Sequence, residues 1–401
     1  MSRIAGRHVV LGVSGGIACY KTCVVARRLT EAGVTVEVVL TAAAAEFVGP
    51  VTFEALTGHP VITSLWHSGR ALDHVRLGRE TDLVVVAPAT AHLIARAAQG
   101  MADDFLTALL LAGRAPVLLC PAMNDQMYAH PETQANLALL RSRGVEVLGP
   151  ATGPLARGEG EGPGRMVEPE EIVGYVERLL RRAAPWTGRR VLVTAGPTRE
   201  ALDPVRVLTN RSSGRMGYAL ARAAWLRGAD VTLVSGPVAL EPPPGVAVVS
   251  VQSTAQMAAA VADALPLADL LLMAAAPADY RPAAPLAQKA KRGEGGLKLE
   301  LEPTADILAG TAARRKTGAV IVGFALETGD AVAGAETKLK AKQLDLVVAN
   351  DALEAGAGPE VPTNRVTIVS RTGVEPLPLL DKAEAAEAIL DRVQVLVSRG
   401  A

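Results

Sequence analysis

Short apolar runs, each followed by a small or polar turn and usually by a helical pattern, restrict the fold of this chain more than any other feature. Runs rich in Val, Leu and Ala are typical of parallel strands that are buried on both faces. We therefore predict an α/β chain of two Rossmann-like, three-layer domains with mainly parallel sheets. The expected strands are His8–Val13, Val34–Leu40, Asp82–Val86, Ala115–Cys120 and Val145–Leu148, then Arg189–Ala195, Val231–Gly236, Asp269–Met273, Ala319–Phe324 and Asp345–Asp351.

The chain is long enough for two domains, each with a full core. With 401 residues, it has one interruption that suits a boundary. A helical pattern over Glu168–Ala184 is followed by Ala184–Gly188 (APWTG), and a new strand begins directly afterwards. We predict domains at residues 1–184 and 189–401.

Composition excludes several classes of function. The 41 basic residues balance the 41 acidic ones, and aromatic residues make up 3% of the chain, so a nucleic-acid surface is not expected. Three cysteines without CxxC spacing indicate neither a disulfide framework nor a zinc site. We see no signal peptide or membrane-spanning run and expect a cytoplasmic protein. All histidines and cysteines precede Pro131, so imidazole or thiol chemistry is confined to the first domain.

The first strand leads into a glycine-rich turn, Ser14–Lys21 (SGGIACYK). Such a turn lets backbone approach a ligand, and the following helix N-terminus favours an anion. The second strand ends at Thr41 rather than at an acid, which disfavours NAD and favours a mononucleotide such as a flavin. A plain βαβ unit, with glycines used only for packing, is the alternative.

Polar residues also follow the third and fourth strands. Thr90, after Ala87–Ala89, is an expected helix N-cap. Asn124 lies in Pro121–Met127 (PAMNDQM) and offers a carboxamide; the alternative is again a helix N-cap. Because parallel strands end at one edge of a sheet, we expect one cleft there. His74, in an apparently strand-like stretch, is the candidate general base, although surface packing is an alternative.

A segment with many glycines and prolines, Gly149–Met166, follows the fifth strand. It has too few apolar residues to form core, and we interpret it as a flap over the cleft. A disordered linker is the alternative, but a helical pattern follows the segment and places it inside the domain.

In the second domain, a Ser- and Gly-rich helix N-terminus at Ser212–Gly217 suits phosphate. The strand after it ends at Ser235, which again disfavours NAD. Asp279, Lys289 and the pair Lys338 and Lys342 suit a nucleoside triphosphate with magnesium; solvated surface lysines are the alternative. We expect Asn364–Ser370 to be an edge strand.

Taken together, these motifs resemble the bacterial bifunctional family that joins phosphopantothenoylcysteine decarboxylase to phosphopantothenate–cysteine ligase. In the first domain the resemblance rests on SGGIACYK, DHVRLGRE, APATAHLIARAAQGMADD, PAMNDQM and GPGRM. In the second it rests on TAGPTRE, LDPVR, NRSSGRMG, ADYRP, KAKR and VGFALE. It covers nearly the whole chain and implies a flavodoxin-like flavoprotein domain followed by a ligase domain.

The resemblance implies a carboxy-lyase and an acid–amino-acid ligase in one chain. The ligase activates 4′-phosphopantothenate with CTP and Mg²⁺ as an acyl-cytidylate, and cysteine then displaces CMP. The flavin domain uses FMN for oxidative decarboxylation to 4′-phosphopantetheine. The implied assembly has a trimeric flavin half and a dimeric ligase half, hence a dodecamer.

Site residues follow from the matching motifs. The resemblance implies catalytic roles for His74, Asn124, Asn210 and Lys289. It implies FMN contacts for Gly12, Ser14, Gly15, Ile17, Thr41, Ala87, Pro88 and Thr90. Expected CTP contacts are Met273, Ala274, Ala275, Asp279, Lys289, Ala305, Asp306, Ile307, Leu308, Phe324, Lys338 and Lys342. Expected substrate contacts are Met127, Arg206, Ser212, Ser213 and Gly214.

One departure from the family concerns the flap, which usually carries a cysteine that helps to reduce the enethiol. Here the flap contains no cysteine, and Arg157 stands near the expected place. The final reduction therefore needs another proton source, or the flavin half is impaired in this step. Two further alternatives are a relative of peptidyl-cysteine decarboxylases or flavin prenyltransferases, and a non-catalytic flavin-binding subunit. A smaller departure is Arg292, where the family often has lysine.

Overall fold

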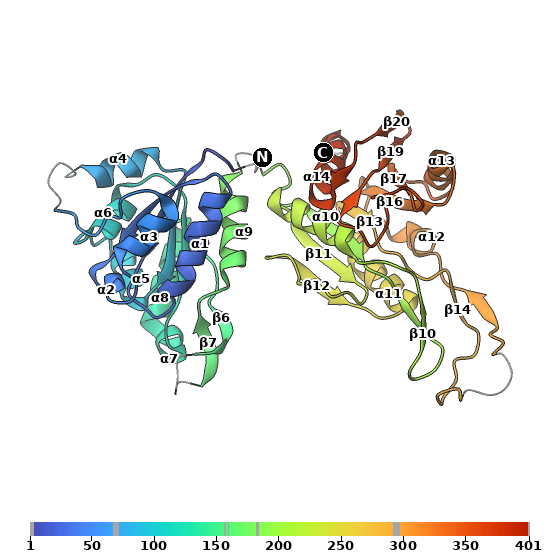
Figure 1. Cartoon of the computed structure of the whole chain (residues 1–401), viewed down its shortest axis with the longest axis horizontal. Coiled ribbons are helices and arrows are strands. Elements are labelled where there is room, and N and C mark those ends of the chain that lie inside the picture. Colours follow the sequence, from blue (N-terminus) through green and yellow to red (C-terminus); the bar gives the residue numbers. More distant parts are fainter. Residues whose placement is uncertain are drawn as a thin grey trace. The chain divides into compact units, whose positions relative to one another are not determined.

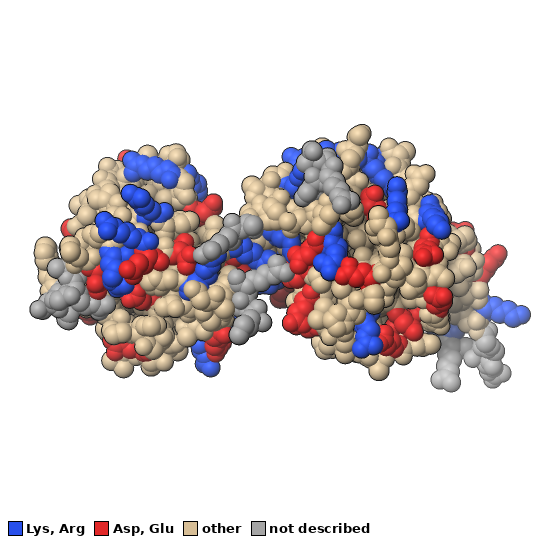
Figure 2. Space-filling model, turned by 90° about the horizontal axis from the view of Figure 1, so that it is seen from above, with Lys and Arg blue, Asp and Glu red and all other residues tan. Residues whose placement is uncertain are grey.

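The computed structural model describes residues 4–66, 72–155, 158, 160–181, 184–291 and 297–399. The chain divides into two compact units, Met1–Arg182 and Ala183–Ala401, which are called unit 1 and unit 2 and described separately (Figure 1). Within the described ranges, no helix is both long and apolar enough to cross a membrane. On the face of each unit that Figure 2 draws, basic and acidic side chains are interspersed.

Unit 1 is built on a parallel five-stranded sheet in the order β2-β1-β3-β4-β5. Its chain order reverses between β1 and β3, as in flavodoxin-like sheets, and ligands bind beside such a reversal at the carboxyl edge. The predicted parallel α/β architecture is confirmed here. The strands are β1 (His8–Val13), β2 (Thr35–Leu40), β3 (Leu83–Ala89), β4 (Val117–Pro121) and β5 (Glu146–Val147).

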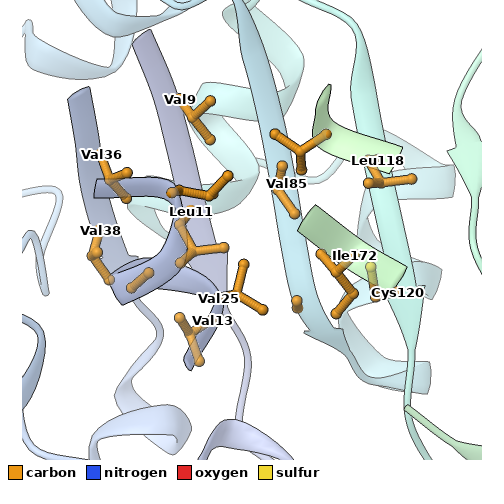
Figure 3. Packing of buried hydrophobic residues seen from close by; sticks show 14 of the residues in the cluster. Val9, Leu11, Val13, Val25, Val36, Val38, Val85, Leu118, Cys120 and Ile172 are labelled. Atoms are coloured by element: carbon orange, nitrogen blue, oxygen red, sulfur yellow. The ribbon is translucent and has the colours of Figure 1, made fainter. Parts of the chain in front are cut away.

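Helices cover both faces of this sheet. Alternate side chains of a strand point to opposite faces, so they pack into two separate hydrophobic cores. Val9, Leu11 and Val13 of β1 pack into one core (Figure 3), whereas Val10 packs into the other. The helices are α1 (Cys19–Glu31), α2 (Ala42–Ala45), α3 (Pro50–Thr57), α4 (Asp73–Glu80), α5 (Ala91–Gln99), α6 (Phe105–Ala112), α7 (Asp125–Ala129), α8 (Pro131–Ser142) and α9 (Pro169–Leu180).

One local prediction for unit 1 was wrong, and one alternative does not hold. The stretch around His74 forms helix α4 rather than a strand, because its apolar residues Val75 and Leu77 are too few to indicate a period and Leu77 packs as a helical residue. The flap is not a linker. It contains an antiparallel hairpin of β6 (Ala151–Pro154) and β7 (Glu161–Arg165). Arg157 lies outside the described residues.

Unit 2 has an eight-stranded sheet in the order β12-β11-β8-β13-β16-β17-β19-β20. Its first six strands run parallel, and β19 and β20 are antiparallel to their neighbours. The expected edge strand, β19, is internal because a turn at Gly373 folds β20 onto it. The strands are β8 (Arg190–Ala195), β11 (Asp230–Ser235), β12 (Ala247–Ser250), β13 (Leu270–Met273), β16 (Val320–Glu327), β17 (Leu346–Asp351), β19 (Thr367–Ser370) and β20 (Gly373–Pro376).

The helices of unit 2 are α10 (Arg215–Leu226), α11 (Thr254–Ala264), α12 (Ile307–Gly310), α13 (Ala331–Ala341) and α14 (Lys382–Arg399), with 3₁₀ turns η1 (Leu265–Leu267) and η2 (Ala312–Arg314). Three small ribbons pair β9 (Arg199–Ala201) with β10 (Val207–Thr209), β14 (Tyr280–Pro282) with β15 (Leu301–Pro303), and β18 (Thr363–Asn364) with β21 (Leu380–Asp381). The first two ribbons and their described connections extend from the sheet (Figure 1), and we call them the arm.

Truncation of a core residue of β1 should weaken unit 1 strongly. Leu11 is fully buried, whereas Val51 on α3 is 75% exposed. We expect Leu11→Ala to lower the free energy of unfolding by about 2–5 kcal/mol, because it removes buried methyl groups and leaves a cavity. Val51→Ala should change it by less than about 0.5 kcal/mol. Urea denaturation followed by circular dichroism measures both, and equal effects would contradict the assigned core.

Candidate functional site

A pocket of about 770 Å³ lies at the carboxyl edge of the unit 1 sheet. Residues that follow four different strands line it, namely Ser14, Thr41, Thr90 and Asn124. Gly15, Ile17 and Met127 line it as well. The structure therefore brings together most of the residues that the sequence assigned to the first cleft.

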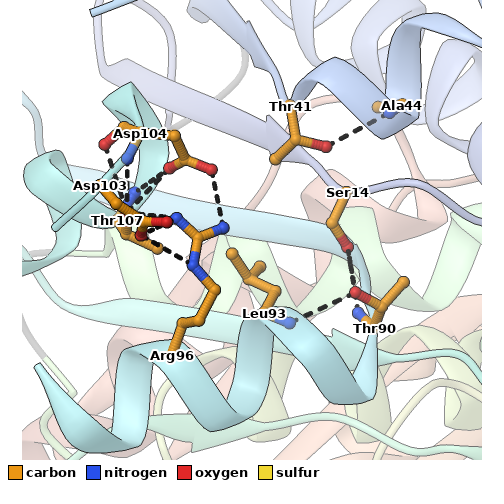
Figure 4. Close-up of polar contacts among 9 residues, drawn as sticks. All are labelled: Ser14, Thr41, Ala44, Thr90, Leu93, Arg96, Asp103, Asp104 and Thr107. Carbon is orange, nitrogen blue, oxygen red and sulfur yellow. Dashed lines mark hydrogen bonds and ion pairs between the residues drawn. The ribbon is translucent and has the colours of Figure 1, made fainter. Parts of the chain in front are cut away.

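The turn after β1 is fixed to the turn after β3 by hydrogen bonds (Figure 4). Ser14 is buried; its Oγ donates to the carbonyl of Pro88 at 2.8 Å and accepts from the backbone N–H of Thr90 at 3.0 Å. Thr90 is also the N-cap of α5, as predicted, with its Oγ1 accepting from the N–H of Leu93. These bonds tie two of the turns that line the pocket to each other.

Helix α1 begins at this turn without a side-chain cap. The N–H groups of Cys19 and Lys21 already donate to the carbonyls of Gly16 and Ala18, so an anion at this turn would meet the N–H groups that precede Cys19. A side chain at Gly15 would come within 2.4 Å of the Cβ of Ala43, so only glycine lets this turn pack against α2. Gly15 therefore serves packing, as in a plain βαβ unit, and its role in phosphate binding stays a prediction.

Asn124 is both a helix cap and a pocket residue. Its Oδ1 accepts from the N–H of Gln126 at 2.9 Å at the start of α7, which confirms the N-cap interpretation. That bond occupies the acceptor side of the carboxamide. The Nδ2 group remains to donate to a ligand in the pocket, so the two interpretations are compatible.

The flap packs directly against the loop that carries Asn124. The N–H of Met123 donates to the carbonyl of Gly164 at 3.0 Å, and a Cβ at Gly164 would lie 2.2 Å from the carbonyl oxygen of Met123. Lys21 of α1 holds the end of the flap from the other side. Its Nζ donates to the carbonyl of Met166 at 3.1 Å and to Glu168 at 3.0 Å.

His74 does not reach this pocket. Its ring makes an edge contact with Phe105 at 6.3 Å between centroids, and its Nδ1 is buried without a hydrogen-bond partner. It is not among the residues that line the pocket. Figure 1 places α4 and α7 at opposite ends of unit 1, so His74 and Asn124 do not face each other within one copy, and the catalytic role of His74 stays a prediction.

Three residues expected to contact the flavin lie next to the pocket without lining it. A Cβ at Gly12 would collide with the side chain of Leu106 at 2.6 Å, so this glycine is needed for packing. Ala87 is fully buried, and Pro88 presents its carbonyl to Ser14. None of the three lines the pocket.

One side of the pocket is formed by charged residues that were not predicted from the sequence. Arg96 of α5 is 8% exposed and forms ion pairs with Asp103 and Asp104 (Figure 4). The Arg96 Nη1–Asp104 Oδ2 distance is 2.9 Å, and both residues line the pocket. The signal was present as an arginine on the apolar face of a helix, followed seven and eight residues later by carboxylates.

In unit 2, the predicted lysine pair lies at the carboxyl edge of the sheet. The ammonium of Lys338 donates to the carbonyl of Phe324, and Lys342 forms an ion pair with Asp306 at 2.9 Å. Burial lowers the pKa of Lys338, and the charge of Lys342 lowers it further. The carboxylates that oppose this shift in pKa are Glu327, Asp306 and Asp279.

Asn210 joins the same edge from a different segment. Its Nδ2 donates to the carbonyl of Pro277 at 2.9 Å, two residues before Asp279. The strand-end residues Met273, Ala274 and Ala275 lie just upstream, and the N–H of Ala275 donates to Thr194. Ala305 and Asp306 precede α12, which Asp306 caps and in which Ile307 and Leu308 are buried.

Other residues expected in the ligase site make no described contact with Lys338 or Lys342. Lys289 is exposed on the arm. Arg206 is bound to Asp203 at 2.6 Å and to the carbonyl of Ala290 at 2.7 Å, so its guanidinium organises the arm. Ser212 accepts from the N–H of Gly214, and Ser213 donates to the carbonyl of Pro359 at 2.6 Å. Arg292 lies outside the described residues.

Lys382 is a buried cation that the sequence did not single out. Its Nζ donates to the carbonyl of Pro359 at 3.0 Å, the same carbonyl that Ser213 contacts. Burial, and secondarily the charge of Arg215, lower its pKa to about 8. Within the described ranges, no group of three or more His, Cys, Asp and Glu side chains is arranged to hold a metal ion.

Lys382 should make stability depend on pH. Its pKa is about 8 in the fold against an ordinary 10.5, so between these values the unfolded chain binds the additional proton. The free energy of unfolding should therefore gain from this residue as pH rises through that window. The urea midpoint of Lys382→Met should rise less with pH than that of the parent. An exposed control, Lys340→Met, should keep the parental slope, and identical slopes for all three would contradict the assignment.

Comparisons with known proteins agree with this division of the chain. Residues 2–181 match the family described as Flavoprotein, and residues 186–396 match the DNA/pantothenate metabolism flavoprotein C-terminal domain. The coenzyme A biosynthesis bifunctional protein CoaBC of Mycobacterium tuberculosis is 51% identical over 92% of this chain and 91% of its own length. The protein of that name from Vibrio cholerae is 47% identical over 97% and 98%.

Among solved structures, the C-terminal domain of a coenzyme A biosynthesis bifunctional protein CoaBC is 39% identical, covering 54% of this chain and 100% of that one, with a TM-score of 0.47. A cysteine mutant of PPC decarboxylase complexed with pantothenoylaminoethenethiol is 28% identical over 42% and 96%, with a TM-score of 0.39. Because it is 44–51% identical to curated CoaBC proteins over 92–97% of its length, this chain belongs to the family of coenzyme A biosynthesis bifunctional proteins.

Proposed function

We propose that this chain catalyses two consecutive steps of coenzyme A biosynthesis. Unit 2 joins 4′-phosphopantothenate to cysteine through an acyl-cytidylate, and unit 1 converts the product to 4′-phosphopantetheine by oxidative decarboxylation. The observation that carries the proposal is the joint presence of the strand-end pocket of unit 1 and the lysine cluster of unit 2 in one member of this family. Likeness to bifunctional enzymes over both halves leaves the alternative of a non-catalytic flavin-binding subunit without support.

The pocket of unit 1 fits FMN. The turn between β1 and α1 would offer a phosphate the N–H groups that precede Cys19, and Ser14, Gly15, Ile17, Thr41 and Thr90 line the space beside it. When bound, FMN accepts electrons from the cysteinyl thiol and so prepares the adjacent carboxylate to leave as carbon dioxide. The protein orients the substrate and keeps water away from it.

Asn124 is suited to hold the substrate carboxylate. Its Oδ1 is already used by the helix cap, so Nδ2 faces the ligand as a donor, and a carboxylate accepts such a bond. Met127 is 50% exposed and lines the pocket beside it. The flap covers this position, although it supplies no thiol, so the proton for the last reduction comes from another group or from water.

The ligase half works by charge and positioning, because it contains no histidine or cysteine. The charge of Lys342, after burial, lowers the pKa of Lys338, and a triphosphate between the two lysines would relieve that repulsion. Asn210 and Asp279 approach from neighbouring turns. We propose CTP as the nucleotide and Mg²⁺ as the ion that accompanies its phosphates.

The chain is proposed to work as an oligomer. His74 lies outside the pocket of its own copy, which supports the view that it completes the pocket of a neighbour in a trimer. The arm exposes large apolar side chains, and a second copy that covers them would give a dimer of ligase halves. These side chains are Val205, Val207, Leu208, Tyr280, Leu286, Leu297, Leu299 and Leu301. The two contacts together would build a dodecamer.

The ligase proposal predicts pyrophosphate release that depends on phosphopantothenate, CTP and Mg²⁺. Without cysteine, mass spectrometry should detect the acyl-cytidylate. Lys338→Gln should slow pyrophosphate release roughly a hundredfold, because a buried cation at the triphosphate is lost. Lys340→Gln, an exposed change on the same helix, should leave the rate unchanged. Absence of pyrophosphate with the parent chain, or a faster reaction with ATP than with CTP, would contradict the proposal.

The decarboxylase proposal predicts that two inactive variants restore each other. His74→Asn and Asn124→Asp should each remain yellow with FMN and release pyrophosphate but no carbon dioxide. Aspartate preserves the helix cap and repels the substrate carboxylate. Co-production of the two chains should restore up to roughly a quarter of the parental carbon dioxide release, since random assembly pairs intact residues in that fraction of shared pockets. No restoration would show that His74 does not act across copies.

A further inference from the structure

A buried polar network lies behind the residues assigned to the ligase site. Its members are the buried side chains of Thr198, Glu200 and Thr254. Their exposed fractions are 0%, 6% and 2%. None of them was assigned to a ligand, and they come from the loop after β8, from β9 and from the start of α11.

The hydrogen bonds of this network have one consistent direction. The N–H of Ala278 donates to Thr198 Oγ1 at 2.8 Å, and the two threonine hydroxyls lie 2.8 Å apart. Thr254 Oγ1 has two acceptors in reach, Glu200 Oε1 at 2.9 Å and the carbonyl of Ala278 at 3.3 Å, and the shorter bond assigns its proton to Glu200. Glu200 is an acceptor, and each hydroxyl has a single proton, so the chain runs from the Ala278 amide through both threonines to the carboxylate.

The carboxylate at the end of this chain is balanced by neutral donors alone. Glu200 Oε1 also accepts from the backbone N–H of Thr254 at 2.8 Å. Across the described parts of the chain, no lysine or arginine forms an ion pair with Glu200. A buried carboxylate without a cation is costly. Such a group is expected to be retained where it orients donors that a neutral residue would hold less firmly.

The network fixes a segment that carries two parts of the proposed site. Ala278 lies between Pro277, whose carbonyl accepts from Asn210 Nδ2 at 2.9 Å, and Asp279, whose carbonyl accepts from the N–H of Thr304 at 2.9 Å. Thr209, next to Asn210, donates to the carbonyl of Thr198 at 2.6 Å. A shift of Ala278 would therefore move Asp279 and Asn210 together.

We infer that Thr198, Thr254 and Glu200 are positioning residues for the ligase reaction, which hold Pro277–Asp279 and Asn210 in register for formation of the acyl-cytidylate. This inference rests on the proposed function for the chemistry and on the described contacts for the positioning. Thr254 is the central member, because its hydroxyl joins the carboxylate to Thr198.

The experiment compares three variants of the full chain. Thr254→Val keeps the shape and the backbone N–H but removes the hydroxyl. Thr254→Ser keeps the hydroxyl. Ser253→Ala is the matched control, because Ser253 caps the same helix through Gln256 on its exposed side and does not contact Ala278. The rate of acyl-cytidylate formation from CTP and phosphopantothenate is measured at saturating substrates, together with amide hydrogen exchange of residues 276–281.

We expect Thr254→Val to form the acyl-cytidylate roughly tenfold more slowly and to exchange faster at residues 276–281, because its neighbours lose their buried partner. Thr254→Ser and Ser253→Ala should stay within about twofold of the parent, and all variants should release carbon dioxide normally from supplied phosphopantothenoylcysteine. A parental rate in Thr254→Val, or an equal loss in Ser253→Ala, would overturn the inference.

The experiment distinguishes failure of the proposed function from failure of the positioning role. If the parent forms no cytidylate, the proposed function fails, and hydrogen exchange alone then decides whether the network holds the segment. Unchanged exchange at residues 276–281 in Thr254→Val would overturn the positioning role in that case as well.

Discussion

Burial of parallel strands on both faces is the constraint on which the rest of this structure depends. Every residue of β3 is buried, and Val9 to Val13 of β1 are buried as well. Side chains at such positions must be apolar, so groups that bind or react are displaced to the turns where strands end. In unit 1 these turns carry Ser14, Thr41, Thr90 and Asn124, and they form one pocket. The same rule places Asp279 and the lysine cluster at the corresponding edge of unit 2.

The two units meet that constraint with different chemistry. Unit 1 lines its pocket with hydroxyl groups, the start of α1 and a half-buried ion pair of Arg96 with Asp104. Unit 2 has no imidazole or thiol and gathers two lysines against carbonyl and carboxylate oxygens. Redox chemistry of a carbon–sulfur substrate needs an enclosed apolar space, whereas transfer at phosphate needs fixed positive charge. The composition of each half matches the reaction proposed for it.

Several side chains that begin or lie on a helix also line the pocket or contact a segment far away along the chain. Asn124 caps α7 and also lines the pocket. Lys21 lies on the first helix but holds the end of the flap, 145 residues away along the chain. Thr254 begins α11 and, through Thr198, fixes the amide of Ala278. Each of these side chains is therefore constrained from two directions, which limits the substitutions that it tolerates.

The sequence by itself determined the class of fold, the parallel strands and the turns that carry polar residues, because apolar periodicity and N-cap chemistry depend on neighbours along the chain. Thr90 and Asn124 as caps, and the lysine pair four residues apart, were therefore predictable. The helix at His74 was missed because eight mixed residues do not define a period, and the position of β19 depended on a later hairpin. Only the tertiary structure decided that His74 lies away from its own pocket, that Arg96 pairs with two aspartates beside it, and that Thr198 supports Ala278. The last contact joins residues 80 positions apart, and a contact of that kind follows from the order of strands in the sheet, which local propensity does not encode.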